Sequence, residues 1–374
     1  MKYMGSKRWM LQNGLGHLLQ KKVATAGRFV DLFAGSGAVA SFVAQRVDVP
    51  VIAFDLQLFC ITLAKAVIGR ITSLDASILW THWYDRALRF LDESKSLDKA
   101  IPEFSKFTRN YVVRVREACA LENNFEITKS YGGHYFSQKQ ALWLDALRNT
   151  LPKDDENRTV ALAALIMAAS QCVASPGHTA QPFQPTRTAK RFLYEAWNRD
   201  IVDKTKAALE ELCGQHALCK GTAKVSDANK AVEQIDRNDV VFIDPPYSGV
   251  HYSRFYHVLE TIARGECGSV SGVGRYPPPD ERPWSRYSVQ SKSREAVSEL
   301  IKSIAEKRAT AIVTFPNKKC SNGISSYLLR KLGKKHFSKV SEVVVRGKFS
   351  TLGGNGNHRA ARQSSAELVL LLES

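Results

Sequence analysis

Two strand-turn-helix patterns near the start of the chain constrain its fold most strongly. The apolar residues 29–33 precede the turn Ala34-Gly35-Ser36-Gly37 and a helical stretch. Residues 51–55 form a second apolar run that ends in Asp55, and a helical stretch follows at 58–70. Consecutive βα units place their strands in parallel and cover both faces of the sheet with helices. We therefore expect an α/β fold with a doubly wound, mostly parallel, Rossmann-like sheet.

Later strand patterns extend this sheet. Strand patterns recur at 222–225, 240–243 and 311–315. The last two runs, 340–348 and 366–372, flank the glycine-rich residues 353–357. This arrangement predicts an antiparallel hairpin at the C-terminal end of the sheet.

Between the two sets of strands the pattern is helical. Helices are expected at 76–92, 107–121, 137–147, 158–173 and 189–213. We expect a discontinuous α/β domain, residues 1–70 and 223–374, that is interrupted by a mainly helical inserted domain at 71–222. Residues 275–293 are too rich in proline and charge for a core element and are expected to form a long loop.

An excess of basic residues predicts a polyanionic partner. Lys and Arg number 53 against 36 Asp and Glu, so the net charge is +17. Nucleic acid is the first candidate. A membrane is not expected, because like charges form no block and the longest apolar segment, 160–169, is too short to span a bilayer. The N-terminal residues lack the apolar region of a secretory signal, so a cytoplasmic location is expected.

Neither a disulfide framework nor a metal site is expected. The seven cysteines form no Cys-x-x-Cys pair and are odd in number, which is typical of reduced, mostly buried thiols. The nine histidines show no ligand-like spacing with cysteines or acids.

The residues Asp244-Pro245-Pro246-Tyr247, directly after the apolar run 240–243, carry the most specific chemistry. Asp244 offers a carboxylate acceptor, and the two prolines remove backbone donors, which leaves the Pro245 carbonyl as a second acceptor. Tyr247 adds an aromatic face. Such a corner suits an aromatic exocyclic amine, whose protons must be held before its nitrogen attacks a methyl group. A plain strand-to-loop turn is the alternative for these four residues alone.

The glycine turn and Asp55 suggest a nucleoside ligand. Backbone N–H groups of Gly35, Ser36 and Gly37 would lie near a helix N-terminus, where they can bind a carboxylate or phosphate. An acid at the end of the second strand takes ribose hydroxyls in doubly wound folds. The pattern GxGxxG is incomplete, so an adenosyl group that carries an amino acid fits better than a dinucleotide. A tight turn alone explains Gly35 and Gly37 equally well.

Taken in chain order, these motifs resemble the Dam-type family of adenine-N6 DNA methyltransferases. The resemblance rests on residues 2–8, 29–37, Asp55 and 244–247, and it extends to 132–145, 175–181 and 288–304. It implies a class I methyltransferase fold, with the insertion serving target recognition. It also implies S-adenosylmethionine as the cofactor, no metal, double-stranded DNA as the substrate, and a cognate restriction nuclease or defence protein as a further partner.

The resemblance also assigns roles to individual residues. Asp244, Pro245, Pro246 and Tyr247 match the catalytic motif, in which a flipped adenine stacks on the tyrosine and donates its amino hydrogens to Asp244 and the Pro245 carbonyl. Asp244 then orients the amine and need not act as a strong base before attack. A cap or turn role is the alternative for Asp227. The residues matched to cofactor binding are Tyr3, Lys7, Phe33, Gly35, Gly37, Asp55, Asp227 and Asp244.

Basic residues outside these motifs are candidates for DNA contacts. Taken singly, each is more often a solvated surface charge, but together they favour phosphate contacts and salt-dependent binding. His178 could contact the cofactor or DNA, and Tyr252, Phe255 and Tyr256 could line a flipped-base pocket or belong to a helix core. The basic candidates are Arg187, Lys190, Arg191, His251, Arg254, Arg282, Arg286, Arg346, Lys348 and Arg359.

Two alternative functions stay open. The same chemistry could act on cytosine N4 or on adenine in RNA, although an Asp as first acceptor and the leading N-terminal motif favour adenine. A catalytically inactive DNA-binding protein could keep this fold, but the intact Asp-Pro-Pro-Tyr motif and glycine turn argue against it.

Overall fold

The chain forms two compact units, which are described separately. The computed structural model describes Tyr3 and residues 5–96, 100–101, 107–350 and 362–374. The α/β unit comprises Gly5–Thr72, His216–Tyr252 and Pro283–Ser374. The helical unit comprises Tyr3 with Ser73–Gln215 and Ser253–Arg282.

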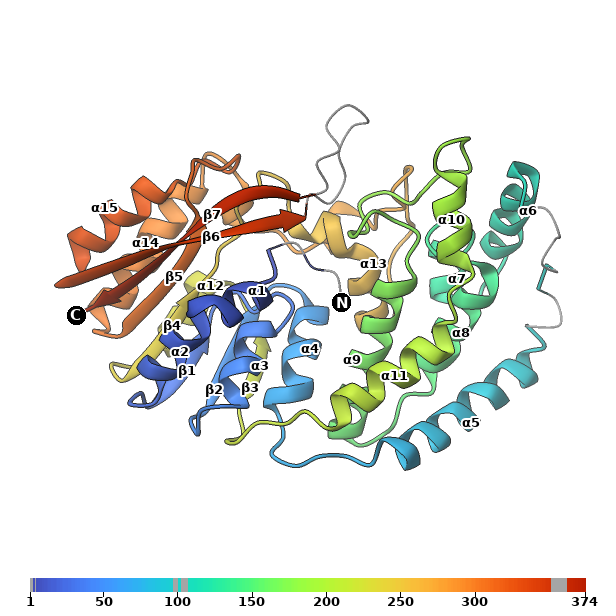
Figure 1. Ribbon diagram of the computed structural model, residues 1–374. Helices are drawn as coiled ribbons and strands as arrows, with labels where there is room; N and C mark the ends of the chain where they lie inside the picture. Colours follow the sequence, from blue (N-terminus) through green and yellow to red (C-terminus); the bar gives the residue numbers. More distant parts are fainter. Residues whose placement is uncertain (1–2, 4, 97–99, 102–106, 351–361) are drawn as a thin grey trace. The chain divides into compact units, whose positions relative to one another are not determined.

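Within the described residues, seven strands form one sheet in the α/β unit (Figure 1). The sheet order is β3-β2-β1-β4-β5-β7-β6, in which the first five are parallel and β7 runs antiparallel to both β5 and β6. The doubly wound sheet and its C-terminal hairpin are therefore confirmed, whereas the expected turn at 353–357 lies outside the described residues. The strands are β1 (Arg28–Asp31), β2 (Val51–Asp55), β3 (Thr222–Val225), β4 (Asp239–Ile243), β5 (Thr310–Pro316), β6 (Lys339–Ser350) and β7 (Arg362–Glu373).

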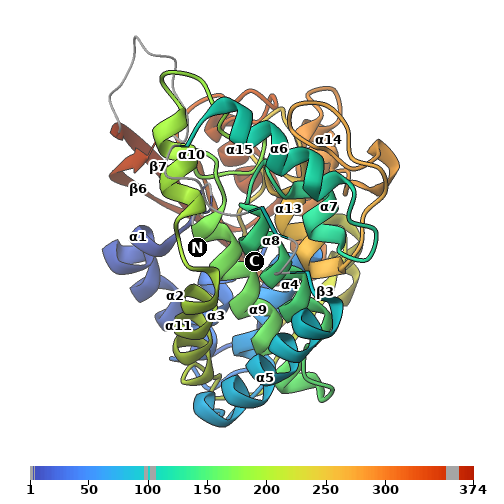
Figure 2. The same ribbon diagram turned by 90° about the vertical axis from the view of Figure 1, so that its right-hand side faces the viewer.

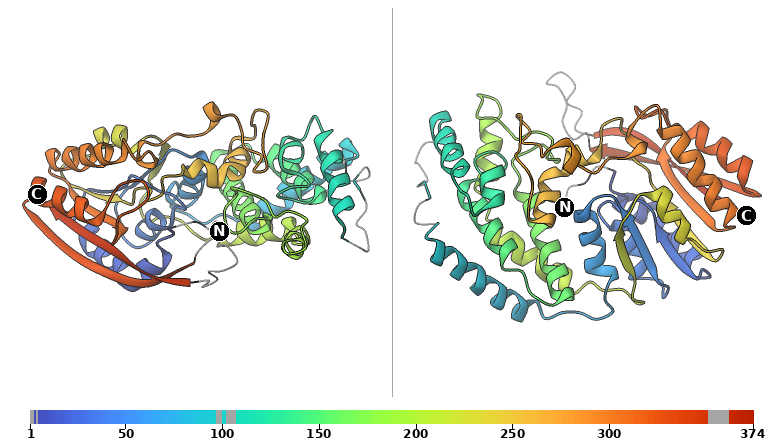
Figure 3. Two further views of the ribbon diagram at one scale, coloured as in Figure 1. Left: turned by 90° about the horizontal axis from the view of Figure 1, so that it is seen from above. Right: turned by 180° about the vertical axis from the view of Figure 1, so that it is seen from behind.

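Alternating strand side chains supply an apolar core on each face of the sheet. In β4, Val241 and Ile243 belong to one core, and Val240 and Phe242 belong to the other. Burial on both faces explains why this strand is an unbroken apolar run. The first core lies against α12 (Ala228–Ala231), α14 (Ser293–Glu306) and α15 (Ser326–His336), and the second against α1 (Arg8–Met10), α2 (Gly16–Val23), α3 (Ala38–Ala44) and α4 (Leu58–Ile68), as Figure 3 helps to follow.

The connections leave β1 and β4 in opposite directions. After β1 the chain passes through α3 to β2, whereas β5 lies on the other side of β4. Adjacent parallel strands with diverging connections leave a crevice at their carboxyl ends, where doubly wound proteins bind ligands. Asp31 of β1 is in register with Phe242 of β4, so the glycine turn and the Asp244 turn start at the same edge of the sheet.

The helical unit has its own apolar interior, and its helices can be followed in Figure 2. Helix α9 carries the apolar segment 160–169 and packs against α8 and α11. Trp83 of α5 is fully buried and donates its indole N–H to the Leu147 carbonyl at 2.9 Å. The helices are α5 (Ala76–Ser94), α6 (Arg109–Ala120), α7 (Glu126–Tyr131), α8 (Gln138–Asn149), α9 (Asp155–Cys172), α10 (Lys190–Trp197), α11 (Ile201–Cys213) and α13 (Tyr252–Arg264), the last from Ser253 onward.

The single helix expected at 189–213 is wrong. Helix α10 ends at Trp197, and α11 starts at Ile201. The Asp200 carboxylate caps the new helix by accepting from the N–H groups of Val202 at 2.8 Å and Asp203 at 3.0 Å. The cap satisfies donors that an uninterrupted helix would have bonded internally, so it favours a break at this point.

Residues 253–282 group with the helical unit, although the sequence placed them in the discontinuous α/β domain. Long-range polar contacts explain this grouping. The Arg148 guanidinium donates to the carbonyls of Ile262, Ala263 and Arg264 at the end of α13, at 2.7–3.0 Å. A sequence pattern contains no information on such partners.

We predict that Gly37→Ala destabilises the α/β unit. Gly37 has φ +73°, and an added Cβ would lie 3.2 Å from the backbone of Ala64 in α4. The left-handed conformation alone should lower the free energy of unfolding by about 1–2 kcal/mol. Urea unfolding followed by circular dichroism measures the change. Gly214→Ala is the control, because Gly214 has φ −77° and its added Cβ would be 4.0 Å from the nearest atom. Equal shifts for both variants would contradict the argument.

Candidate active site

Three carboxylates mark the carboxyl edge of the central strands. Asp31 ends β1, Asp55 ends β2, and Asp244 follows the last residue of β4. Because these strands are parallel and adjacent, their carboxyl ends meet at one edge. The edge therefore gathers three carboxyl groups at the ends of β1, β2 and β4.

Asp55 holds the glycine turn in place. Its carboxylate accepts from the N–H of Gly35 at 2.9 Å and from the N–H of Gln57 at 3.0 Å. The Gly37 N–H is also used, since it donates to the Ala34 carbonyl at 2.8 Å. The turn N–H groups expected to bind an anionic ligand are thus partly engaged within the protein. Asp55 is part-buried, and carboxylate oxygens can accept hydrogen bonds from the hydroxyl groups of a ribose.

Asp244 belongs to a buried charge cluster. The Lys7 ammonium lies 2.9 Å from Asp244 Oδ1 and 3.1 Å from Oε2 of Glu367, a residue of β7. The Thr314 hydroxyl of β5 donates to the same Oδ1 at 2.9 Å. Burial raises the pKa of Asp244, whereas Lys7 and Thr314 lower it. Since both contacts use Oδ1, Oδ2 is left available as an acceptor for a substrate amine.

Lys7 is the cation of this cluster. Its side chain is only 3% exposed, and the carboxylates of Asp244 and Glu367 hold its pKa well above the usual value despite burial. The sequence matched Lys7 to cofactor binding. The structure brings it together with the catalytic carboxylate, so its charge also acts on Asp244.

The Asp-Pro-Pro-Tyr turn is braced by a residue that the sequence analysis missed. The fully buried Asn322 donates through Nδ2 to the carbonyls of Pro246 at 2.6 Å and Tyr287 at 3.0 Å. Within the described residues no hydrogen bond engages the Pro245 carbonyl. The Pro245 carbonyl therefore remains a candidate for the acceptor role that the sequence suggested.

Tyr247 lies beside the N-terminal motif. Its ring contacts Tyr252 edge-on, with ring centroids 6.4 Å apart. Gly5 has φ +76°, and a Cβ at this position would lie 2.9 Å from the Tyr247 hydroxyl. Only glycine allows the chain to pass this close to the ring.

Phe33 and Asp227 lie near the ends of β1 and β3. Phe33 contacts Tyr287 edge-on at 5.0 Å between centroids. Asp227 caps α12 by accepting from the Asn229 N–H at 2.9 Å. The cap role weighed for Asp227 is thus present in the structure, and only its remaining oxygen lone pairs could serve a ligand.

Several candidate residues lie in the helical unit. Tyr3 stacks on Tyr256 of α13, with centroids 4.8 Å apart and planes 11° from parallel. His178 accepts from the Ala180 N–H at 3.2 Å and lies against Phe255. Arg254 and Arg282 both lie over the Tyr276 ring. Exposed basic side chains of this unit include Arg187, Lys190 and Arg191.

The remaining basic candidates belong to the α/β unit. His251 accepts from the Ser285 N–H at 3.3 Å. Arg286 pairs with Glu299 at 2.7 Å and Glu295 at 3.4 Å, so much of its charge is neutralised. The backbones of Arg346 and Lys348 lie in β6, but their side chains are outside the described part of the structure, as is all of Arg359.

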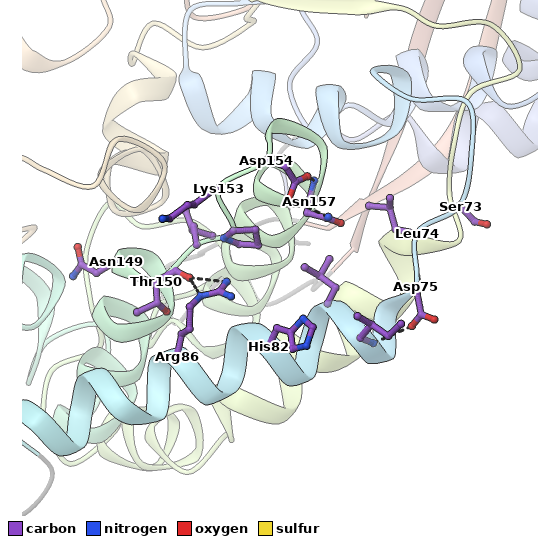
Figure 4. Close-up of a pocket in the computed structure, with 14 residues that line it drawn as sticks. Ser73, Leu74, Asp75, His82, Arg86, Asn149, Thr150, Lys153, Asp154 and Asn157 are labelled. Carbon is purple, nitrogen blue, oxygen red and sulfur yellow. Dashed lines mark hydrogen bonds between the residues drawn. The ribbon is translucent and has the colours of Figure 1, made fainter.

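A cavity of about 850 Å³ in the helical unit contains none of the predicted site residues (Figure 4). Three of its charged side chains form hydrogen bonds to the backbone and stabilise the fold. Arg86 donates to the Thr150 carbonyl, and Asp75 and Asp154 cap α5 and α9.

The described residues include neither a metal-binding cluster nor a membrane-spanning helix. In the part of the chain that the structure describes, no cluster of three or more His, Cys, Asp or Glu could hold a metal ion. No described helix is both long and apolar enough to cross a bilayer. All seven cysteines are free thiols, and five of them are buried, as expected.

The parallel sheet, its antiparallel terminal hairpin and the acidic edge with the Asp-Pro-Pro-Tyr turn define a Rossmann-like methyltransferase fold. Residues 3–314 match the D12 class N6 adenine-specific DNA methyltransferases, and the chain belongs to this family. The resemblance drawn from the sequence is thereby confirmed.

Curated relatives agree with this assignment. Modification methylase LlaI of Lactococcus lactis subsp. lactis is 23% identical over 318 residues, 81% of this chain and 44% of the relative. Type II methyltransferase M.FokI of Planomicrobium okeanokoites is 24% identical over 279 residues, 73% of this chain and 38% of the relative. Type II methyltransferase M.NlaIII of Neisseria lactamica is 26% identical over 282 residues, 70% of this chain and 69% of the relative. The chain thus spans about two fifths of the length of the first two relatives.

Some site residues that the sequence analysis did not identify can still be recognised by a feature of the sequence. Asp31 interrupts the apolar run 29–33, and Glu367 interrupts the apolar run 366–372. A charged residue inside a buried strand requires a partner or a shifted pKa. Asn322 and Thr314 left no such signal, because Asn is common in loops and Thr is common in strands.

We predict that Asn322→Ala loosens the Asp-Pro-Pro-Tyr turn. The change leaves two buried carbonyls without their donor, and it removes the acceptor of the Ile324 N–H. The free energy of unfolding should fall by about 1–3 kcal/mol. Asn317→Ala is the control, since Asn317 is exposed and should change stability by less than about 0.5 kcal/mol. Urea titrations compare the two variants, and an effect of Asn322→Ala no larger than that of the control would exclude this bracing role.

A second prediction concerns Asp31 and pH. Burial raises the pKa of its carboxyl from 3.8 to about 8, so the folded state keeps a proton that the unfolded chain releases. Through this group, the free energy of unfolding falls as the pH rises from about 4 to about 8. Asp31→Asn keeps an uncharged acceptor for the Phe33 N–H and removes this dependence. Relative to the wild type, the variant should gain stability between about pH 5 and about pH 8 in urea titrations. Parallel pH profiles would contradict the assignment.

Proposed function

We propose that the protein transfers a methyl group from S-adenosylmethionine to N6 of adenine in double-stranded DNA, at a specific site. Family membership supports the reaction class. The observation that carries the proposal is the Asp244 carboxylate, which is fixed through Oδ1 and retains Oδ2 for an amine. Because the chain covers less than half of the first relatives' length, its activity and partners are part of this proposal.

The acidic edge suits S-adenosylmethionine, which supplies an electrophilic methyl group on a positively charged sulfur. Asp55, Asp244 and Glu367 outnumber the single buried cation, Lys7, so a cationic ligand gains favourable charge interactions. Asp55 and the glycine turn would hold the adenosyl ribose, and Phe33 and Asp227 would lie near its base. Tyr3 and Lys7 are proposed for the methionine part, and no metal is needed for this chemistry.

The reaction is assigned to the Asp-Pro-Pro-Tyr turn. Asp244 Oδ2 and the Pro245 carbonyl accept the two amino hydrogens of adenine, which localises the nitrogen lone pair for attack on the methyl group. Tyr247 stacks on the flipped base, a contact worth about 1–3 kcal/mol that offsets part of the unstacking cost. The amine loses a proton after the methyl group is attached, and Asp244 Oδ2 is the nearest proposed acceptor.

Double-stranded DNA is the proposed partner, with the helical unit as its recognition element. The exposed cluster Arg187, Lys190 and Arg191 and the exposed Arg254 suit phosphate contacts. His251, Arg282, Arg346, Lys348 and Arg359 stay candidates, whereas Arg286 is the weakest because it already has two acidic partners. We also propose a cytoplasmic location and a cognate restriction nuclease or defence protein.

One assay tests the reaction. The protein is incubated with duplex DNA, single-stranded RNA and labelled S-adenosylmethionine, and the products are digested to nucleosides. We expect label only in N6-methyldeoxyadenosine. Label in N4-methyldeoxycytidine or in methylated RNA would redirect the proposal, and no label in any duplex at low salt would refute it.

Two variants separate catalysis from cofactor binding. Asp244→Asn keeps the size of the side chain but removes its charge, so kcat should fall by about 100-fold or more. Its dissociation constant for S-adenosylmethionine, measured by calorimetry, should change by less than about threefold, because Asp244 mainly holds the amine. Asp55→Ala should instead weaken cofactor binding by about tenfold, which corresponds to about 1.4 kcal/mol. If Asp244→Asn weakens cofactor binding as much as Asp55→Ala, Asp244 mainly serves the cofactor.

A further inference from the structure

Glu367 is a buried acidic residue in a strand of the terminal hairpin. Folding of the hairpin alone does not require a charge at this position. It is 3% exposed and sits in β7, in register with Pro316 of β5 and Val345 of β6. Its neighbours from Leu368 to Leu372 are apolar and buried. A carboxylate here costs solvation free energy, so its retention calls for a role beyond packing.

The only cation near Glu367 among the described residues is Lys7, at 3.1 Å. Lys7 also contacts Asp244, so one ammonium is shared between two carboxylates. With both carboxylates ionised and Lys7 protonated, the cluster carries one net negative charge. Neither carboxylate can therefore be fully neutralised by Lys7 while the other is ionised.

We propose that Glu367 is a positioning residue of the methyl transfer: it anchors Lys7 against Asp244 Oδ1 and shares the charge of Lys7, so that Asp244 Oδ2 stays a strong acceptor. This inference rests on the proposed function. Glu367 touches neither the substrate nor the reacting atoms and acts through Lys7. Without Glu367, Lys7 would be held by Asp244 alone and would draw more electron density from its carboxylate.

Other ionisable groups around this cluster are few. Tyr247 faces Lys7 from the catalytic turn, Asp31 faces Asp244 from β1, and Cys320 faces Glu367 from the segment after β5. Burial raises the pKa values of Tyr247, Asp31 and Cys320, so each is mainly neutral at neutral pH. Lys7 is accordingly the group through which Glu367 acts on Asp244.

Two substitutions separate charge from position. Glu367→Gln keeps an oxygen that can accept from Lys7 but removes the negative charge. Glu367→Leu removes both. Neither leaves a buried charge without a partner, because Lys7 and Asp244 remain as a balanced pair. Both variants should therefore fold.

The same strand offers a matched control. Glu373 of β7 also pairs with a lysine of the N-terminal segment, Lys22 of α2, at 2.5 Å. It has no contact with Asp244. Glu373 also lies 3.5 Å from Lys339, and its side chain is 23% exposed. Glu373→Gln and Glu373→Leu thus remove less buried ion pairs from the same strand without touching the charge cluster, and they should keep wild-type kcat.

The kinetic test uses kcat, KM for DNA and the pH dependence of kcat. With Glu367→Gln, the full charge of Lys7 acts on Asp244 and makes its carboxylate a weaker acceptor, so kcat should fall about tenfold. The same charge lowers the pKa of Asp244, so the acid limb of the pH profile of kcat should move about one pH unit lower. KM for DNA should change by less than about twofold, because a loss of transition-state interactions lowers kcat. Glu367→Leu should lower kcat further. Wild-type kcat and an unmoved acid limb in both variants would overturn the proposal, as would a loss of kcat without any movement of the limb.

A second measurement does not depend on turnover. Acetylation of lysines by acetic anhydride, read by peptide mass spectrometry, reports how well each ammonium is held. Lys7 should be protected in the wild type and react at least about fivefold faster in Glu367→Leu, whereas the reaction rate of Lys22 should stay unchanged. In Glu373→Leu, Lys22 should react faster and the reaction rate of Lys7 should stay unchanged. Unchanged Lys7 labelling would overturn the anchoring role. If the wild type methylates no nucleic acid but Lys7 labelling rises as expected, the proposed function fails and the anchoring by Glu367 stands.

Discussion

The adjacency of β1 and β4 determines where chemistry can occur in this protein. Their parallel pairing sends the two connections to opposite sides and leaves the carboxyl edge open between them. The glycine turn follows one strand and the Asp-Pro-Pro-Tyr turn follows the other. The glycine turn and the Asp-Pro-Pro-Tyr turn are therefore neighbours because of strand order, before any side chain is considered.

Much of this arrangement could be predicted from local sequence. Strand β3 was expected with its exact bounds, and β4 and β5 within one residue, because an apolar run bounded by polar residues is a local property. Asp244, Pro245 and Tyr247 were also identifiable, since their chemistry follows from four consecutive residues. The break before α11 could have been read from Asp200, a strong helix-capping residue, but the amphipathic pattern on both sides concealed it.

The partners of these residues could not be predicted. Lys7 was matched to the cofactor, yet its contacts with Asp244 and Glu367 depend on how the first residues and the last strand fold onto the sheet centre. Asn322 braces the catalytic turn from a loop far along the chain. Likewise, the grouping of α13 with the helical unit depends on the hydrogen bonds of Arg148. These bonds are tertiary contacts that the local sequence does not predict. Long-range polar partners are determined by the tertiary structure, and the hydrophobic periodicity of the sequence does not predict them.

The position of Glu367 has a consequence for biosynthesis. The charge cluster joins residue 7 to residue 367, so it closes only after β7 has been translated. A nascent chain that has completed β4 and β5 carries Lys7 and Asp244 but lacks the strand that supplies the second carboxylate. Such non-local closure is slow relative to helix formation. A ribosome-bound fragment that ends before β7 would thus lack the assembled charge cluster.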